Sequence, residues 1–144
     1  MAETRTDFHA GQPSIRVDFR VRYAECDAFG YLHHAKYWEY FEHSRTELLR
    51  ACGIRYRDLE TQGTFFVVYK CACKYLRPIR YDDLVTVTAR VLRTTHTRVD
   101  HAYEIHRDAE LACEGCTTLA CVDRAGRPQV MPAELWSHRG QIEP

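Results

Sequence analysis

The spacing of apolar residues changes twice along this chain, and the order of those changes limits the folds it can adopt. The stretch "SIRVDFRVRY", at residues 14–23, alternates apolar and mostly charged side chains with a period of two. This period predicts a half-buried β-strand. Residues 35–52 instead repeat apolar side chains in steps of four and three, which predicts an amphipathic helix that ends at Gly53. One strand and one long helix therefore open the predicted fold.

Four strand-like runs follow the helix, after one or two further helical turns at residues 56–63. The runs cover residues 64–79, 83–92, 98–107 and 111–123. Parallel strands need crossovers of about a dozen residues or more, which these links cannot provide, so we expect an antiparallel meander. One helix covering one face of such a sheet gives an α+β fold with about five strands. A short terminal helix is expected within the tail "PAELWSHRG".

The length of 144 residues predicts one domain. Residues 1–13 lack periodicity and end at Pro13, so we expect a disordered N-terminal tail followed by a single domain over residues 14–144. The first residues are polar and lack an apolar core, so we expect no signal peptide. The cysteines number seven, an odd count, which favours reduced thiols and a cytoplasmic location.

The charge balance argues against two classes of partner. Lys and Arg together number 20, as do Asp and Glu, so no overall positive field favours binding to nucleic acid or to an anionic membrane. No apolar run approaches the roughly 20 residues that would span a bilayer. We therefore expect neither nucleic acid nor a membrane as a partner.

Several cysteines and histidines have spacings that resemble functional sites. The pairs Cys71/Cys73 and Cys113/Cys116 could each form half of a zinc site, but they lie mostly within predicted strands rather than at tight turns, which favours small packed side chains and no metal. Cys26 could be a nucleophile, but the adjacent carboxylate disfavours its thiolate. We interpret His101 and His106 as cross-strand or surface residues of a strand.

The segment "DAFGYLHHAKY" places Asp27, Gly30, His33 and His34 immediately before the predicted helix. An Asp in a turn often serves only as a helix cap or an Asx-turn, although Asp27 is about seven residues from the helix body and too far to cap it. Alternatively, its carboxylate could face a carbonyl carbon while N–H groups at the helix start hold the oxygen. Gly30 would permit the loop to turn back. The residues alone leave both interpretations open.

The longer segment "RYAECDAFGYLHHAKYWEYFEHSRTELL" resembles the active-site region of the 4-hydroxybenzoyl-CoA thioesterase family, especially its YbgC-like branch. The shared pattern is Asp, two residues, Gly, three residues and His-Ala-x-Tyr, followed by an aromatic-rich helix with "FE..RTE". A weaker resemblance extends over about residues 15–132. It implies a hotdog fold, in which a curved antiparallel sheet wraps a long central helix.

The resemblance also implies an activity and its site. Members hydrolyse acyl thioesters of CoA or acyl carrier protein without metal or cofactor. They form homo-oligomers, dimers at least and commonly tetramers, with active sites between subunits. Asp27 would be the catalytic carboxylate, either as nucleophile or as general base, and backbone N–H groups near His34 would polarise the carbonyl. Gly30 would shape the loop between them.

Other positions keep alternatives open. The resemblance places His33, Tyr37 and Phe66 at the substrate pocket, and it makes Glu42 an alternative catalytic group, although Glu42 could simply pair with Arg45 or Thr46 on the same helix. Bulky residues beside Gly30 leave the acyl group and the carrier open. A non-catalytic acyl-thioester-binding module, or a dehydratase or cyclase acting on a carrier-bound chain, could use the same fold.

Overall fold

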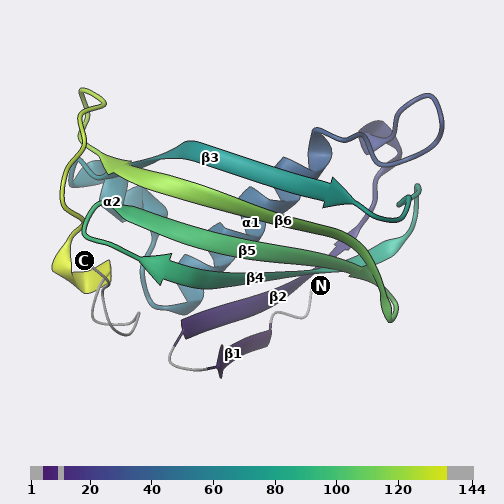
Figure 1. Cartoon of the computed structure of the whole chain (residues 1–144), viewed down its shortest axis with the longest axis horizontal. Coiled ribbons are helices and arrows are strands. Elements are labelled where there is room, and N and C mark those ends of the chain that lie inside the picture. The colour runs from purple at the N-terminus through teal and green to yellow at the C-terminus, as the bar shows by residue number, and fades with distance from the viewer. Residues whose placement is uncertain (1–4, 10–11, 136–144) are drawn as a thin grey trace.

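The computed structural model describes residues 5–9 and 12–135, which form a curved antiparallel sheet and one long helix (Figure 1). The strands are β1 (Arg5–His9), β2 (Gln12–Arg20), β3 (Phe65–Tyr75), β4 (Leu84–Thr94), β5 (Arg98–Arg107) and β6 (Glu110–Val122). The helices are α1 (Lys36–Ala51), α2 (Tyr56–Thr61) and the short 3-10 turns η1 (Tyr23–Glu25) and η2 (Ala133–Leu135). The predicted α+β fold, a central helix wrapped by an antiparallel sheet, is confirmed.

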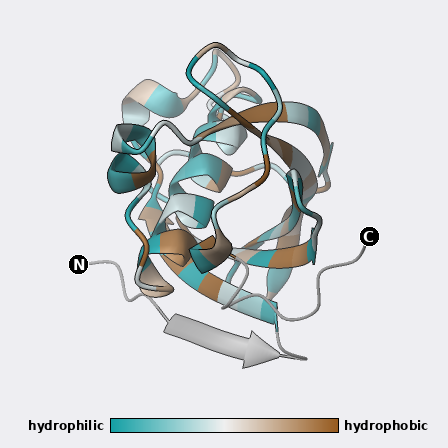
Figure 2. Cartoon of the chain, turned by 90° about the vertical axis from the view of Figure 1, so that its left-hand side faces the viewer, coloured by the Kyte–Doolittle hydropathy of each residue, from teal (hydrophilic) through white to brown (hydrophobic). Residues whose placement is uncertain are grey.

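Helix α1 lies in the hollow of the sheet, which curves around it (Figures 1 and 2). The apolar stripe that predicted this helix is its buried face, and Phe41 stacks on Tyr103 of β5 with ring centroids 4.4 Å apart. The helix ends where predicted, because Gly53 adopts a φ of 84° and donates its N–H to the carbonyl of Arg50 at 2.9 Å. Such a left-handed residue is the usual helix stop.

The strands that face α1 alternate buried and outward side chains, as their sequence period predicts. Val17 of β2 pairs with Val87 of β4, which in turn pairs with Ile105 of β5. These residues are almost fully buried together with the others of the same face. The buried set on these strands includes Ile15, Val17, Val85, Val87, Ala89, Val91, Val99, Tyr103 and Ile105.

Strand β6 approaches α1 closely at Gly115. A Cβ atom placed on Gly115 would lie 2.8 Å from the Phe41 ring and 3.3 Å from the Ala72 carbonyl oxygen. The absence of a side chain therefore lets the aromatic ring pack directly on the strand, which is the role expected of a glycine inside a strand.

The strand order is β1-β2-β4-β5-β6-β3. The predicted meander is correct for β4, β5 and β6, but it is wrong for β3, which pairs with β6 at the far edge of the sheet instead of with β4. Residues 76–83, the β3–β4 link, cross one end of the curved sheet (Figure 1). A short link requires antiparallel directions, but it does not require adjacent strands when the sheet curves.

The expected disordered tail over residues 1–13 is also wrong where the structure describes it. Strand β1 pairs antiparallel with β2, with Thr6 opposite Ile15, and β2 already begins at Gln12. Backbone groups on the open side of β2 can pair with any extended segment, so β1 can form without an alternation of apolar residues. Residues 1–4 and 10–11, and residues 136–140 of the expected terminal helix, lie outside the described residues.

Candidate active site

The segment between β2 and α1, the site loop (residues 21–35), is held against the β3–β4 link by backbone hydrogen bonds. Val21 donates its N–H to the carbonyl of Asp83 at 2.9 Å, and Leu32 donates to that of Ile79 at 2.7 Å. Two segments that are distant in the sequence therefore fix the shape of the loop that precedes the helix.

Asp27 builds a tight turn inside the site loop. Its Oδ1 accepts the N–H of Phe29 at 2.9 Å and that of Tyr31 at 3.2 Å, while its own N–H donates to the Tyr31 carbonyl at 2.8 Å. Gly30 has a φ of 81°, a conformation that costs other residues energy. No donor within the described chain contacts the other carboxylate oxygen, Oδ2.

The same turn occurs a second time in this molecule. Oδ1 of Asp123 accepts the N–H groups of Ala125 and Arg127, both at 2.9 Å, and Gly126 also has a φ of 81°. In this copy, however, Oδ2 pairs with the Arg127 guanidinium at 3.3 Å. The hydrogen bond from the Arg127 N–H is the largest influence that lowers the pKa of Asp123. The turn alone therefore does not identify an active site. The residues around Asp27 are needed to distinguish it from Asp123.

Those surroundings are an open groove of about 360 Å³ between the site loop, the start of α1 and the end of β3. Its lining residues include Asp27, Tyr31, His34, Tyr37, Tyr75 and Arg77. Three of the residues predicted at the site, Asp27, His34 and Tyr37, thus share one cavity. His33 does not line it, and its ring stacks on that of His34 with centroids 4.2 Å apart.

The backbone at His34 presents an unused donor. Its neighbours are occupied, since Ala35 donates its N–H to the His33 ring at 3.1 Å and Lys36 donates to the His33 carbonyl at 2.9 Å. For the N–H of His34, the described residues supply no acceptor. The hydroxyl of Tyr75 holds this residue from its other side by donating to the His34 carbonyl at 2.9 Å.

Sequence reasoning did not assign Tyr75 to the site. The residue lies 41 positions after His34, so no local spacing connects them. Its ring meets that of Tyr37 edge to face with centroids 4.8 Å apart. Burial is the largest cause that raises the pKa of Tyr75 to about 12, and burial also raises the pKa of Tyr37. Both phenols are therefore neutral hydrogen-bond donors at ordinary pH.

Glu42 and Phe66 belong to a different cavity, of about 250 Å³, further along α1. Glu42 is exposed and pairs with Arg45 at 3.7 Å, as one of the two sequence interpretations expects, and Thr46 donates to the Glu42 backbone carbonyl. His101 is buried on β5 and lines this second cavity. The structure therefore does not bring Glu42 or Phe66 into the groove of Asp27.

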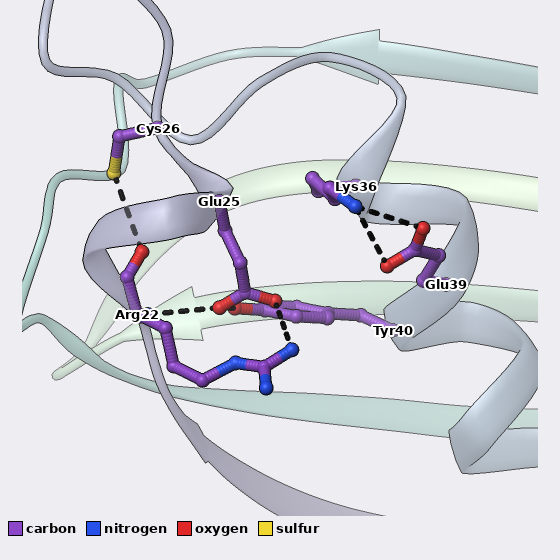
Figure 3. A network of polar contacts seen from close by, with 6 residues as sticks. All are labelled: Arg22, Glu25, Cys26, Lys36, Glu39 and Tyr40. Carbon is purple, nitrogen blue, oxygen red and sulfur yellow. Dashed lines mark hydrogen bonds and ion pairs between the residues drawn. The ribbon is translucent and has the colours of Figure 1, made fainter.

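Glu25 is a buried carboxylate that sequence reasoning missed (Figure 3). It accepts the backbone N–H of Arg22 at 2.8 Å, the Tyr40 hydroxyl at 2.9 Å and the Arg22 guanidinium at 3.4 Å. Burial acts to raise the pKa of Glu25, but these three hydrogen bonds together lower it below the usual value. An acidic residue three positions after Arg22 is the available sequence signal, because this spacing is that of a capping box.

The Cys26 thiol lies 3.8 Å from the Arg22 carbonyl, to which it donates. Burial, followed by the charges of Asp27 and Glu25, raises the pKa of Cys26, which agrees with the argument against a catalytic thiolate. Within the described residues, no group of three or more His, Cys, Asp or Glu side chains is placed to hold a metal ion. None of the described helices is long and apolar enough to cross a membrane.

Residues 21–137 match the model of the thioesterase-like superfamily. The chain belongs to this superfamily. The matched region contains the site loop, α1 and the sheet from β3 to β6, so it covers the whole groove. This assignment confirms the predicted family and supports the predicted enzyme class, a thioester hydrolase.

Named relatives of this superfamily member agree with the assignment. The chain is 31% identical to the acyl-CoA thioesterase YbgC of Haemophilus influenzae over 81% of its length and 87% of that protein. It is 29% identical to the acyl-acyl carrier protein thioesterase ATL3 of Arabidopsis thaliana over 84% of its length and 65% of that protein. The crystal structure of DHNA-CoA thioesterase from Staphylococcus aureus superposes with a TM-score of 0.78 at 31% identity, covering 80% of this chain and 78% of that one.

Proposed function

We propose that this superfamily member hydrolyses the thioester bond of acyl-CoA or acyl-carrier-protein substrates, with Asp27 as its catalytic carboxylate. One observation carries the proposal: Asp27 lines the same groove as His34, whose amide N–H has no acceptor in the described chain. Thioester hydrolysis needs a nucleophilic or basic oxygen and a donor for the carbonyl oxygen. The groove offers one of each.

The end of the site loop, just before α1, would supply the donor. His34 lies one residue before Ala35, the N-cap of α1, and the helix dipole places partial positive charge at this end of the helix. The amide of His34 would hold the thioester carbonyl oxygen and stabilise the negative charge that develops on it. The Tyr75 hydroxyl would keep this residue in place through its bond to the His34 carbonyl.

Asp27 could act by either of two routes. As nucleophile, Oδ2 attacks the thioester carbon, the carbon–sulfur bond breaks and the thiolate leaves, after which water cleaves the mixed anhydride. As general base, the carboxylate takes a proton from the water that attacks the same carbon. In both routes, the hydrogen bonds from Phe29 and Tyr31 orient the carboxylate through Oδ1 and leave Oδ2 for the reaction.

The carrier is proposed from the relatives. YbgC is named for acyl-CoA and ATL3 for acyl carrier protein, and both carriers present the acyl group on the same phosphopantetheine arm. Arg77 lines the groove, where its Nε also pairs with Glu110 at 2.8 Å, and its guanidinium is a candidate contact for a phosphate of that arm, since Arg is well suited to phosphate. We expect a cytoplasmic location, as the sequence predicts.

A homo-oligomer is part of the proposal, a dimer at least. Strand β3 is the edge of the sheet next to β6, and its exposed side chains include Val67, Val68 and Tyr69. An exposed apolar edge strand favours pairing with another chain. A second copy of this chain is the occupant that we propose for this edge, beside the groove to which β3 contributes Tyr75.

The two copies of the Asp turn provide a matched test of the catalytic role. Asn retains an oxygen that can accept the turn hydrogen bonds but cannot act as a carboxylate, so both Asp27→Asn and Asp123→Asn should fold. With acyl-CoA and acyl-carrier-protein thioesters, we expect Asp27→Asn to lower kcat/KM by about 10²- to 10⁴-fold. Asp123→Asn should remain close to wild type. The measurement is release of free thiol over a panel of acyl groups.

Two outcomes would contradict this proposal. If Asp27→Asn retains the full rate, the catalytic role of Asp27 is wrong and Glu42→Gln becomes the next variant to assay. If neither wild type nor variant releases thiol while acyl-CoA still binds, as measured by calorimetry, the protein is a non-catalytic binding module instead.

A further inference from the structure

Two thiols meet between β3 and β6. The Sγ atoms of Cys73 and Cys113 lie 3.2 Å apart. The two residues are diagonal neighbours across the strand pair, because Cys73 is opposite Gly115 and Cys113 is opposite Tyr75. Cys113 is fully buried, whereas Cys73 is half-buried on the edge strand. In a single copy of the chain, solvent can therefore reach this pair from the side of Cys73.

We propose that Cys73 and Cys113 are a redox-sensitive modification site, at which hydrogen peroxide converts the thiol pair into a reversible disulfide. The sulfur atoms of a disulfide are about 2.05 Å apart, so the two Sγ atoms must approach by roughly 1 Å. Rotation of the side chains and a small movement of the edge strand can supply this approach.

The reaction needs one molecule of peroxide for each disulfide. The Cys73 thiolate attacks one peroxide oxygen, the O–O bond breaks, and a sulfenic acid and hydroxide form. The Cys113 sulfur then attacks the Cys73 sulfur, the S–O bond breaks, and the disulfide forms. The two thiol protons end in the two water molecules that leave, and the two electrons lost by the sulfurs reduce the peroxide.

The surroundings assign different roles to the two thiols. The hydrogen bond from Cys113 lowers the pKa of Cys73, while the same contact and burial raise the pKa of Cys113. The more acidic and more accessible thiol is the one that reacts first with peroxide. Cys71 and Cys116 are exposed on the same two strands, but they lie opposite Thr117 and Ala72, so they provide internal controls.

Formation of the disulfide should also change the shape of the groove and so lower the activity, an inference that rests on the proposed function. Cys73 is two residues before Tyr75, so both side chains point to the same face of β3. Tyr75 holds the carbonyl of His34 and packs against Tyr37. Movement of Cys73 toward Cys113 should displace this tyrosine, and we expect a lower kcat/KM for thioesters after oxidation.

The test treats the folded full chain with hydrogen peroxide, unfolds it in denaturant so that buried thiols also react, blocks the remaining thiols with an alkylating reagent and maps the peptides by mass spectrometry. We expect two of the seven cysteines to become unreactive, with a peptide linked through Cys73 and Cys113 that dithiothreitol releases. Cys73→Ser and Cys113→Ala should each abolish this linked peptide, whereas Cys71→Ser should retain it. Because Cys113 is buried, circular dichroism confirms that its variant is folded.

The proposal is overturned if Cys73 stops at a sulfenic or sulfinic acid without a link, or if the linked peptide joins other cysteines. It is also overturned if Cys113→Ala is folded and still gives the same loss of two thiols. Peptide mapping requires no catalysis, so a protein without thioesterase activity would still reveal the disulfide. Conversely, an active enzyme without the linked peptide would refute only the redox site.

Discussion

Asp27 and Asp123 accept hydrogen bonds from the residues two and four positions further along, and both turns contain a left-handed glycine. They differ in what lies beyond the turn. The second oxygen of Asp123 is in an ion pair with Arg127, whereas Asp27 lines a groove at the start of a helix. The spacing Asp-x-x-Gly predicts the turn in both places, but only the neighbouring helix and strand distinguish a candidate catalytic carboxylate.

Glu25 gives a residue-scale prediction about pH. The pKa of Glu25 is lowered in the fold, so its carboxylate takes up a proton at higher pH in the unfolded chain than in the folded chain. The ionised carboxylate therefore stabilises the fold fully at pH values above 4.5, the ordinary pKa of Glu. This stabilisation is lost as the pH falls through the lowered pKa that Glu25 has in the folded protein. We expect Glu25→Gln to lower the free energy of unfolding by about 1.5–3 kcal/mol near neutral pH, and by progressively less in acid.

Urea unfolding of wild type and variant, between about pH 7 and about pH 3, measures this difference. Glu39→Gln is the matched control, because Glu39 is exposed and its pair with Lys36 should contribute only about 0–1 kcal/mol. A constant gap between wild type and Glu25→Gln across this range would show that Glu25 contributes through packing and not through its charge.

At the scale of elements, the sequence predicted most of what the structure contains. The period of three and four residues located α1, and the alternation in "RVDHAYEIHR" located β5 at its observed bounds. Local spacing could not place β3 beside β6, because that pairing joins residues 38 to 57 positions apart and leaves no local pattern. For the same reason Tyr75 was missed at the site, while Asp27, Gly30 and His34 lie within one short segment.

Gly115 provides a prediction about how α1 packs on β6. Gly115→Ala would place a methyl group 2.8 Å from the Phe41 ring, so we expect a loss of about 1–3 kcal/mol in the free energy of unfolding. When Phe41 is replaced by Leu, the ring is gone, so adding Gly115→Ala to Phe41→Leu should cost less free energy of unfolding than adding it to wild type. Thermal and urea unfolding of the four proteins form a double-mutant cycle, and strictly additive effects would contradict the proposed contact.

At the scale of the whole molecule, the edge at β3 predicts how copies associate. Charged residues protect edge strands from pairing, so Val67→Lys combined with Val68→Lys should shift an oligomer toward monomer in sedimentation velocity. Leu92→Lys is the matched control, since Leu92 is similarly exposed but lies on β4, within the sheet. An unchanged sedimentation coefficient for the double variant would place the interface elsewhere.

The turn at Asp27 also has a consequence for engineering. Its hydrogen bonds use backbone atoms and the Asp side chain, so the side chains at positions 29 and 31 are not needed to form it. Phe29 is 81% exposed, and Tyr31 lines the groove. In the copy at Asp123, the corresponding positions carry Ala125 and Arg127 on the same backbone. A library randomised at Phe29 and Tyr31 should therefore keep the fold while it varies the entrance to the groove.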